Sequence, residues 1–228
     1  MFAGHLGAAL VTSRIEPRVN VGVFATASLL LDILLWLFVL LGWESVEIGA
    51  DFARTHQPRF TFAYSHGLVA SLVWSALAGA LVLLWAWRRK EIRWHASLLV
   101  AAVVFSHWLL DALVHRAEMP LAGTGSTAVG AGLWDHMALA LVVEAALVVA
   151  GVAMLLSAHA ASRGRQFALG ALCLLVLAFT VAGMTVAPPP PSAAAMAATS
   201  LATIALVCAL AGWLGRRPHQ GRVPHRAF

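Results

Sequence analysis

Three acidic residues lie within long apolar stretches of the sequence: Asp32 in SLLLDILLW, Asp111 in SHWLLDALVH and Glu144 in LALVVEAALVV. A carboxylate at the centre of a bilayer costs roughly 2.5–3.5 kcal/mol even on a lenient insertion scale. Acids in such positions are therefore rare, usually have partners and mark functional sites. The candidate partners are the nearby histidines His5, His66, His107, His115 and His136. Histidines and carboxylates that meet in a helical bundle indicate a metal site.

The composition is that of an integral membrane protein. Of the 228 residues, 61% are hydrophobic and 11% are charged, and the mean hydropathy is +0.85. A soluble domain carries about 25% charged residues. The apolar stretches are continuous and about 20 residues or longer, which indicates helices rather than barrel strands. We therefore expect an all-α, polytopic membrane helical bundle that forms one domain over residues 1–228.

The apolar pattern predicts six full spans and one short N-terminal membrane helix. The short helix, at about residues 2–13, cannot cross a core of about 30 Å at 1.5 Å per residue. The six spans are expected at residues 19–43, 61–87, 92–115, 133–158, 166–187 and 192–214. Within this domain we expect a metal-site core (1–150), two additional spans (151–214) and a basic cytoplasmic tail (215–228).

The basic residues predict the orientation, because cytoplasmic loops carry an excess of lysine and arginine. Twelve of the fifteen fall on one side: Arg14, Arg18, Arg88, Arg89, Lys90, Arg93, Arg163, Arg165, Arg216, Arg217, Arg222 and Arg226. The other side holds only Arg54, Arg59 and Arg116. We expect a multi-pass protein of the cytoplasmic (inner) membrane with a cytoplasmic C-terminus. The positive charge then needs no nucleic-acid partner, since no basic groove or stacking motif is present.

This topology brings titratable groups from five segments to one layer, the outer half of the bilayer. His107, Asp111 and His115 are spaced at i, i+4 and i+8, so they form one stripe on a helix. A His-xxx-Asp pair on one helical face is a natural pair of metal ligands. The alternative for His107 and Asp111 is a hydrogen-bonded pair that joins helices.

Several motifs resemble those of one family, the inner-membrane-bound metal-dependent hydrolases that are also described as LexA-binding. The similar elements are GHLGAAL near the N-terminus, LLLDILLW, YSHGL, SHWLLDALVHR, GLW at 132–134 and VVEAAL. The resemblance covers most of residues 1–150 and says little about the last two spans. We infer no protein partner for this chain from the resemblance.

The same pattern distantly resembles the zinc-dependent phospholipase C and P1-type nuclease fold, whose all-helical enzymes bind zinc through histidines and aspartates in a similar order. This resemblance implies that the metal ligands are His5, Asp32, His66, His107 and Asp111. The chain departs from the last motif, because His136 and Glu144 are eight residues apart rather than four. The departure implies fewer metals, or His115 or Asp135 as a substitute ligand.

The leading functional hypothesis is a membrane metal-dependent hydrolase. Nitrogen and carboxylate ligands suit zinc, with manganese or iron as alternatives. Glu144, or a carboxylate among Asp32 and Asp111 that does not bind the metal, is the expected base. Arg116 and His115 are the expected substrate-binding residues, since an arginine at the outer rim neutralises a phosphate. The expected substrate is a phosphoester of a membrane lipid or a lipid-linked molecule.

Three other classes remain open. Buried ionisable residues also line the ion paths of transporters, although the sequence shows no inverted repeat or broken-helix pair. A b-type haem protein would use two axial histidines such as His66 and His107 and would show a Soret band, but haem iron needs no buried acids. A structural or partner-binding membrane protein would leave the acids unexplained.

Overall fold

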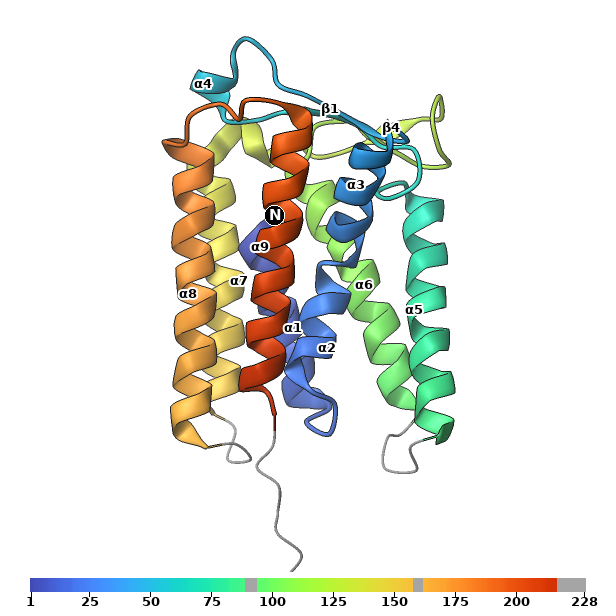
Figure 1. The fold of residues 1–228 in the computed structure, drawn as a ribbon, viewed down its shortest axis with the longest axis vertical. Coiled ribbons are helices and arrows are strands. Elements are labelled where there is room, and N and C mark those ends of the chain that lie inside the picture. Colours follow the sequence, from blue (N-terminus) through green and yellow to red (C-terminus); the bar gives the residue numbers. More distant parts are fainter. Residues whose placement is uncertain (89–93, 158–161, 217–228) are drawn as a thin grey trace, which may run out of the picture.

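The computed structural model describes residues 1–88, 94–157 and 162–216, which form an all-α bundle (Figure 1). Five helices in these residues are long and apolar enough to cross a membrane. They are α5 (Leu68–Arg88), α6 (His95–Val114), α7 (Met137–Leu156), α8 (Arg163–Thr185) and α9 (Ala193–Leu214). The predicted membrane helical bundle is confirmed. One expected boundary is wrong, because the second span begins at Leu68 rather than at residue 61.

The first of the six expected spans is broken. The apolar pattern predicts one continuous helix over 19–43, but the structure has α2 (Val21–Ser28) and α3 (Leu30–Leu41), bent by 51°. The break lies at Leu29, whose backbone leaves the helical region (φ −108°, ψ 9°). The carbonyl of Ser28 accepts a hydrogen bond from the His107 ring, so a side chain satisfies backbone at the bend. The bend places Asp32 in the first turn of α3.

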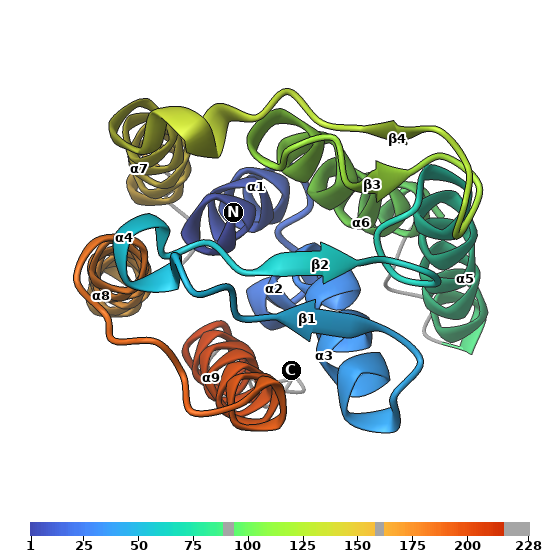
Figure 2. The same ribbon diagram turned by 90° about the horizontal axis from the view of Figure 1, so that it is seen from above.

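The short helix α1 (Phe2–Ile15) runs inside the bundle, and Figure 2 shows it enclosed by α2, α6, α7 and α8. Its close contact with α7 depends on glycine. A Cβ on Gly7 would lie 2.5 Å from the Leu147 carbonyl oxygen, and one on Gly151 would lie 2.7 Å from the Gly7 carbonyl oxygen. Small residues at such crossings let two membrane helices approach through their backbones. The expected short N-terminal helix is present, and it carries His5 into the interior.

The loops at one end of the bundle form a cap, seen from above in Figure 2. Strand β1 (Ser45–Glu47) pairs antiparallel with β2 (Arg59–Thr61), with Val46 opposite Phe60. Between them lies the single-turn helix α4 (Phe52–Thr55). A second antiparallel pair, β3 (Met119–Pro120) and β4 (Ala128–Val129), precedes the 3₁₀ helix η1 (Leu133–His136). The cap covers the end of the bundle that is nearer to Asp32, Asp111 and Glu144.

The outward faces of the long helices are apolar. Leu81 of α5 is 67% exposed and Leu175 of α8 is 68% exposed. Exposed apolar surface on this scale indicates a membrane interaction surface, and the chain is a multi-pass membrane protein by this criterion and by helix length. The predicted basic positions Arg89, Lys90, Arg93, Arg217, Arg222 and Arg226 lie outside the described residues, as do the predicted tail from residue 217 and the span ends at residues 92 and 158.

Candidate metal centre

Four segments bring histidines and aspartates to one point beneath the cap. His5 comes from α1, Asp32 from α3, His66 from the segment before α5, and His107 and Asp111 from α6. Potential ligand atoms of His66, His107 and Asp111 all lie within 4.8 Å of one another, and so do those of His5, Asp32 and His107. The structure therefore brings together all five residues expected to be ligands.

Asp111 lies at the middle of the cluster and is only 2% exposed. Its Oδ1 atom is 2.8 Å from the amino group of Met1 and 3.1 Å from His5 Nε2. Its Oδ2 atom is 3.1 Å from His107 Nε2 and 3.4 Å from His66 Nε2. A buried carboxylate is tolerated only with partners of this kind, and here both oxygens have them.

His107 presents a lone pair to the cluster. Its Nδ1 atom lies 2.7 Å from the carbonyl oxygen of Ser28, and a carbonyl only accepts, so Nδ1 carries the proton. In the neutral form of this ring Nε2 is unprotonated, and it lies 3.1 Å from Asp111 Oδ2. Fixing one ring nitrogen through an acceptor is how proteins orient histidine ligands of metals.

His66 is oriented in the same sense through a two-step chain of hydrogen bonds. The Ser65 hydroxyl donates to Glu44 Oε2 at 2.6 Å, so its oxygen accepts from His66 Nδ1 at 2.8 Å. Glu44 Oε1 is fixed in turn by three backbone N–H donors, from residues 63, 64 and 65, at 2.7–2.9 Å. In the neutral form of His66, Nε2 therefore also carries a lone pair, and it lies 3.2 Å from Nε2 of His107.

The resulting triangle has the dimensions of a metal site. The sides joining His66 Nε2, His107 Nε2 and Asp111 Oδ2 measure 3.2, 3.4 and 3.1 Å. Tetrahedral ligands at about 2.0–2.2 Å from one ion stand about 3.3–3.6 Å apart. Two lone pairs and a carboxylate oxygen at these separations repel one another unless a cation or proton lies between them. Three protein ligands with one open position is the arrangement of catalytic zinc sites.

The second group, His5, Asp32 and His107, overlaps the first. His107 has only Nε2 free, because its Nδ1 is bonded to Ser28, so it can serve one ion and not two. Asp32 Oδ1 lies 3.7 Å from His66 Nε2 and 3.8 Å from His107 Nε2. His5 stacks on His107 at 3.7 Å between ring centroids, and its buried Nδ1 has no partner among the described residues. The described residues thus support one ion, with His5 and Asp32 beside it.

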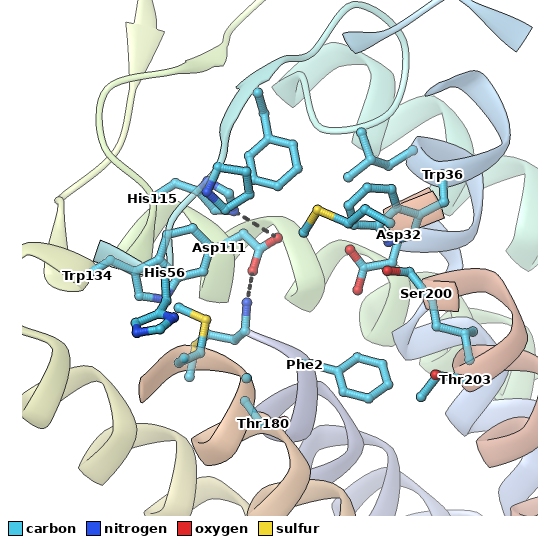
Figure 3. Close-up of a pocket in the computed structure, with 18 of the residues that line it drawn as sticks. Phe2, Asp32, Trp36, His56, Asp111, His115, Trp134, Thr180, Ser200 and Thr203 are labelled. Atoms are coloured by element: carbon cyan, nitrogen blue, oxygen red, sulfur yellow. Dashed lines mark hydrogen bonds and ion pairs between the residues drawn. The ribbon is translucent and has the colours of Figure 1, made fainter. Parts of the chain in front are cut away.

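A cavity of about 290 Å³ adjoins the cluster, lined by Asp32, His66, Asp111, His115 and Glu144 among others (Figure 3). Nδ1 of His115 donates to Glu118 Oε1 at 2.6 Å, and its Nε2 lies 3.8 Å from Asp111 Oδ2. Glu144 accepts a hydrogen bond from the backbone N–H of Gly4 at 3.1 Å. Even with the Met1 amino group counted as a cation, the carboxylates of Asp32, Asp111 and Glu144 leave a formal charge of −2. A divalent cation would balance that charge.

Arg116 is not brought into this cavity. It forms an ion pair with Asp135 at 2.6 Å, and both side chains are about half exposed (51% and 49%). The hydrogen bond to Asp135 raises the pKa of the Arg116 guanidinium. Arg116 lines a separate hollow with Arg54 and Gln57. Of the expected substrate-binding residues, the structure therefore places His115 at the cavity and Arg116 outside it.

Sequence reasoning missed Glu44, Glu118 and His56. Glu44 and Glu118 fix the ring nitrogens of His66 and His115, and His56 lines the cavity with a buried Nδ1 atom that has no partner among the described residues. No spacing pattern marks them, because all three lie in the cap loops. A carboxylate three residues after His115 is the one local signal, and it identifies only Glu118.

Comparison with family models, with curated proteins and with solved structures finds no match to this chain. Neither a family nor a known fold relative therefore supplies its activity. The chemistry of the centre has to be inferred from its own residues.

Proposed function

We propose that this protein is a metal-dependent hydrolase of the cytoplasmic membrane that cleaves a phosphoester in the outer half of the bilayer. The observation that supports it most strongly is the triangle of His66 Nε2, His107 Nε2 and Asp111 Oδ2, with sides of 3.1–3.4 Å. Its nitrogen and oxygen donors fit zinc first, with manganese or iron as alternatives. The motif resemblance to membrane metal-dependent hydrolases agrees with this proposal.

The residues around the triangle have separate roles in this proposal. A bound divalent cation supplies Lewis acidity and lowers the pKa of a water molecule to about 7. Asp32 lines the cavity, is partly open to it (18% side-chain exposure) and lies within 4 Å of both ring nitrogens, so we assign it the role of general base. Glu144, on the α7 wall, is the second candidate base. His115 would contact the substrate.

The experiment is hydrolysis of a phosphodiester probe, bis(p-nitrophenyl) phosphate, by the purified protein in detergent. We expect a chelator to abolish turnover and zinc, manganese or iron to restore it. Asp111→Ala should abolish turnover, while Asp135→Asn, which alters an exposed acid outside the cavity, should leave it intact. Comparison of Asp32→Asn with Glu144→Gln separates the two candidate bases. Retained turnover in Asp111→Ala would reject the assignment of the centre.

An ion-coupled transporter is the second candidate, and the broken span favours it. Transporters place ion and substrate sites at the ends of interrupted helices, and Asp32 lies in the first turn after the break at Leu29. Ion-driven uptake in proteoliposomes, without any hydrolysis, would favour this function over the first.

The haem alternative does not fit the geometry. The Nε2 atoms of His66 and His107 are 3.2 Å apart, and their rings meet edge-on at 65°. Axial ligands of one haem lie on opposite faces of the porphyrin, and no porphyrin plane passes between atoms this close.

A further inference from the structure

The last two helices form one wall of the cavity. Phe179, Gly183 and Met184 of α8 and Met196 and Ile204 of α9 line it, facing the polar cluster contributed by the first 150 residues. Figure 3 shows Thr180, Ser200 and Thr203 on this side and His115, Asp111 and Trp134 on the other side. The wall contributes no ionisable side chain to the cavity. The cavity is therefore charged on one side and uncharged on the other. The hydroxyls of Thr180, Thr199 and Thr203 on the uncharged side donate to carbonyls of their own helices, which leaves Phe179, Met184, Met196 and Ile204 as its apolar lining.

This wall also faces the surroundings of the bundle. Phe179 lines the cavity and is 60% exposed. Thr199 of α9 likewise lines the cavity and is exposed. Because α8 and α9 are membrane-spanning by length and hydropathy, the medium against their outer surface is the hydrocarbon of the bilayer. The occupant that matches both sides of the cavity is an amphiphile from that medium.

We propose that α8 and α9 bind a single hydrocarbon chain of a membrane lipid, whose polar group is directed at Asp32 and Asp111. The identification of this lipid as the substrate rests on the proposed hydrolase function. Its binding at this site does not depend on that function. The cavity volume of about 290 Å³ is just below the range of roughly 300–1,000 Å³ that is usual for ligand pockets. It accommodates part of one chain and excludes a second.

Gly183 sets the room available to the chain. A Cβ at Gly183 would meet no atom within 4 Å, and its backbone does not require glycine because its φ is not in the left-handed region. A Cβ there therefore displaces no protein atom, and because Gly183 lines the cavity, a larger side chain would occupy part of it. Gly164, on the same helix, also has open space around a built Cβ but does not line the cavity. The two glycines are a matched pair for testing the inference.

The test uses the full-length protein and a lysophosphatidylcholine that carries a photoactivatable diazirine in its acyl chain. After illumination, the labelled peptides are identified by mass spectrometry. We expect label on α8 and α9 around Gly183, reduced about tenfold or more by Gly183→Leu, since a misfit in an apolar pocket is worth about 10–200-fold. Gly164→Leu should label like the wild type. If Gly183→Leu fails to fold, Ser200→Leu on the neighbouring helix α9 serves as the second variant and should reduce the label in the same way.

The outcomes separate this inference from the proposed function. Label spread equally over α5 and α6, or unchanged labelling in folded Gly183→Leu, overturns the chain-binding inference. Labelling at α8 and α9 by a protein that hydrolyses no phosphoester supports the lipid site and rejects only the hydrolase.

Discussion

At the scale of residues, the chemistry of the centre depends on which nitrogen of each histidine ring carries its proton. The carbonyl of Ser28 fixes Nδ1 of His107 as a donor, and the Glu44–Ser65 pair does the same for His66. Both assignments follow from the acceptors that the rings contact. The two Nε2 lone pairs are thereby made available to a cation before any cation binds.

Glu44→Gln should therefore weaken metal binding without removing any ligand. The amide nitrogen would donate to the Ser65 hydroxyl, which would then donate to His66 Nδ1 and move the ring proton to Nε2. Loss of an orienting partner of this kind typically costs about 10–100-fold in metal affinity. The measurement is zinc affinity by competition with a chelator, with Glu47→Gln as control, since Glu47 is an exposed glutamate three residues after Glu44. Equal affinities in the two variants would contradict the tautomer assignment.

The residues that bear the chemistry could be predicted because burial of an acid in a membrane span demands an explanation. That reasoning identified Asp32 and Asp111 as site residues, and the helical spacing from Asp111 identified His107. It could not give Glu44 or Ser28, because their roles arise from contacts across the fold: Ser28 lies 79 positions from His107 in sequence. Arg116 was expected at the substrate, but its ion pair with Asp135 holds it in a different hollow.

At the scale of elements, the position of α1 determines which groups adjoin the three proposed ligands. The helix carries His5 and the Gly4 N–H that binds Glu144, and it lies against α7 through Gly7 and Gly151. The sequence predicted the short helix but not this crossing. It also predicted one continuous span where the structure has a break between α2 and α3, because residues 23–41 around Leu29 contain no proline or glycine to mark a bend.

Gly7→Ala should destabilise the protein and disturb the centre together. Its new Cβ would lie 2.5 Å from a backbone carbonyl of α7, which cannot rotate away. We expect the free energy of unfolding to fall by about 1–3 kcal/mol, the usual cost of overpacking. Thermal unfolding in detergent measures this, and Gly164→Ala, with open space around it, is the control. An unchanged melting temperature in Gly7→Ala would mean that α1 does not lie this close to α7.

At the scale of the whole molecule, the bundle has two unlike ends. The described basic residues Arg14, Arg88, Arg163 and Arg216 lie at helix ends opposite the cap (Figure 1). From the positive-inside rule we expect the cap, the cavity and the centre to lie on the outer side. Hydropathy was sufficient to predict the all-α bundle, because each full span other than the broken one is a single long apolar helix.

Two cysteine variants test this orientation. In intact cells, Thr124→Cys in the cap should react with a membrane-impermeant maleimide, and Ser162→Cys at the other end should react only after lysis. The native Cys173 and Cys208 lie within apolar spans, where such a reagent does not reach them. The reverse labelling pattern would place the centre on the cytoplasmic side.

The central claim is that this bundle holds a metal ion between His66, His107 and Asp111. It is tested most directly by the metal content of the purified protein, measured by inductively coupled plasma mass spectrometry in chelator-free detergent. We predict about one equivalent of zinc, manganese or iron in the wild type, as in other three-ligand sites, and none in folded His107→Ala/Asp111→Ala. A folded wild-type protein that contains no metal after exposure to these ions, or a double variant that retains it, would contradict the account.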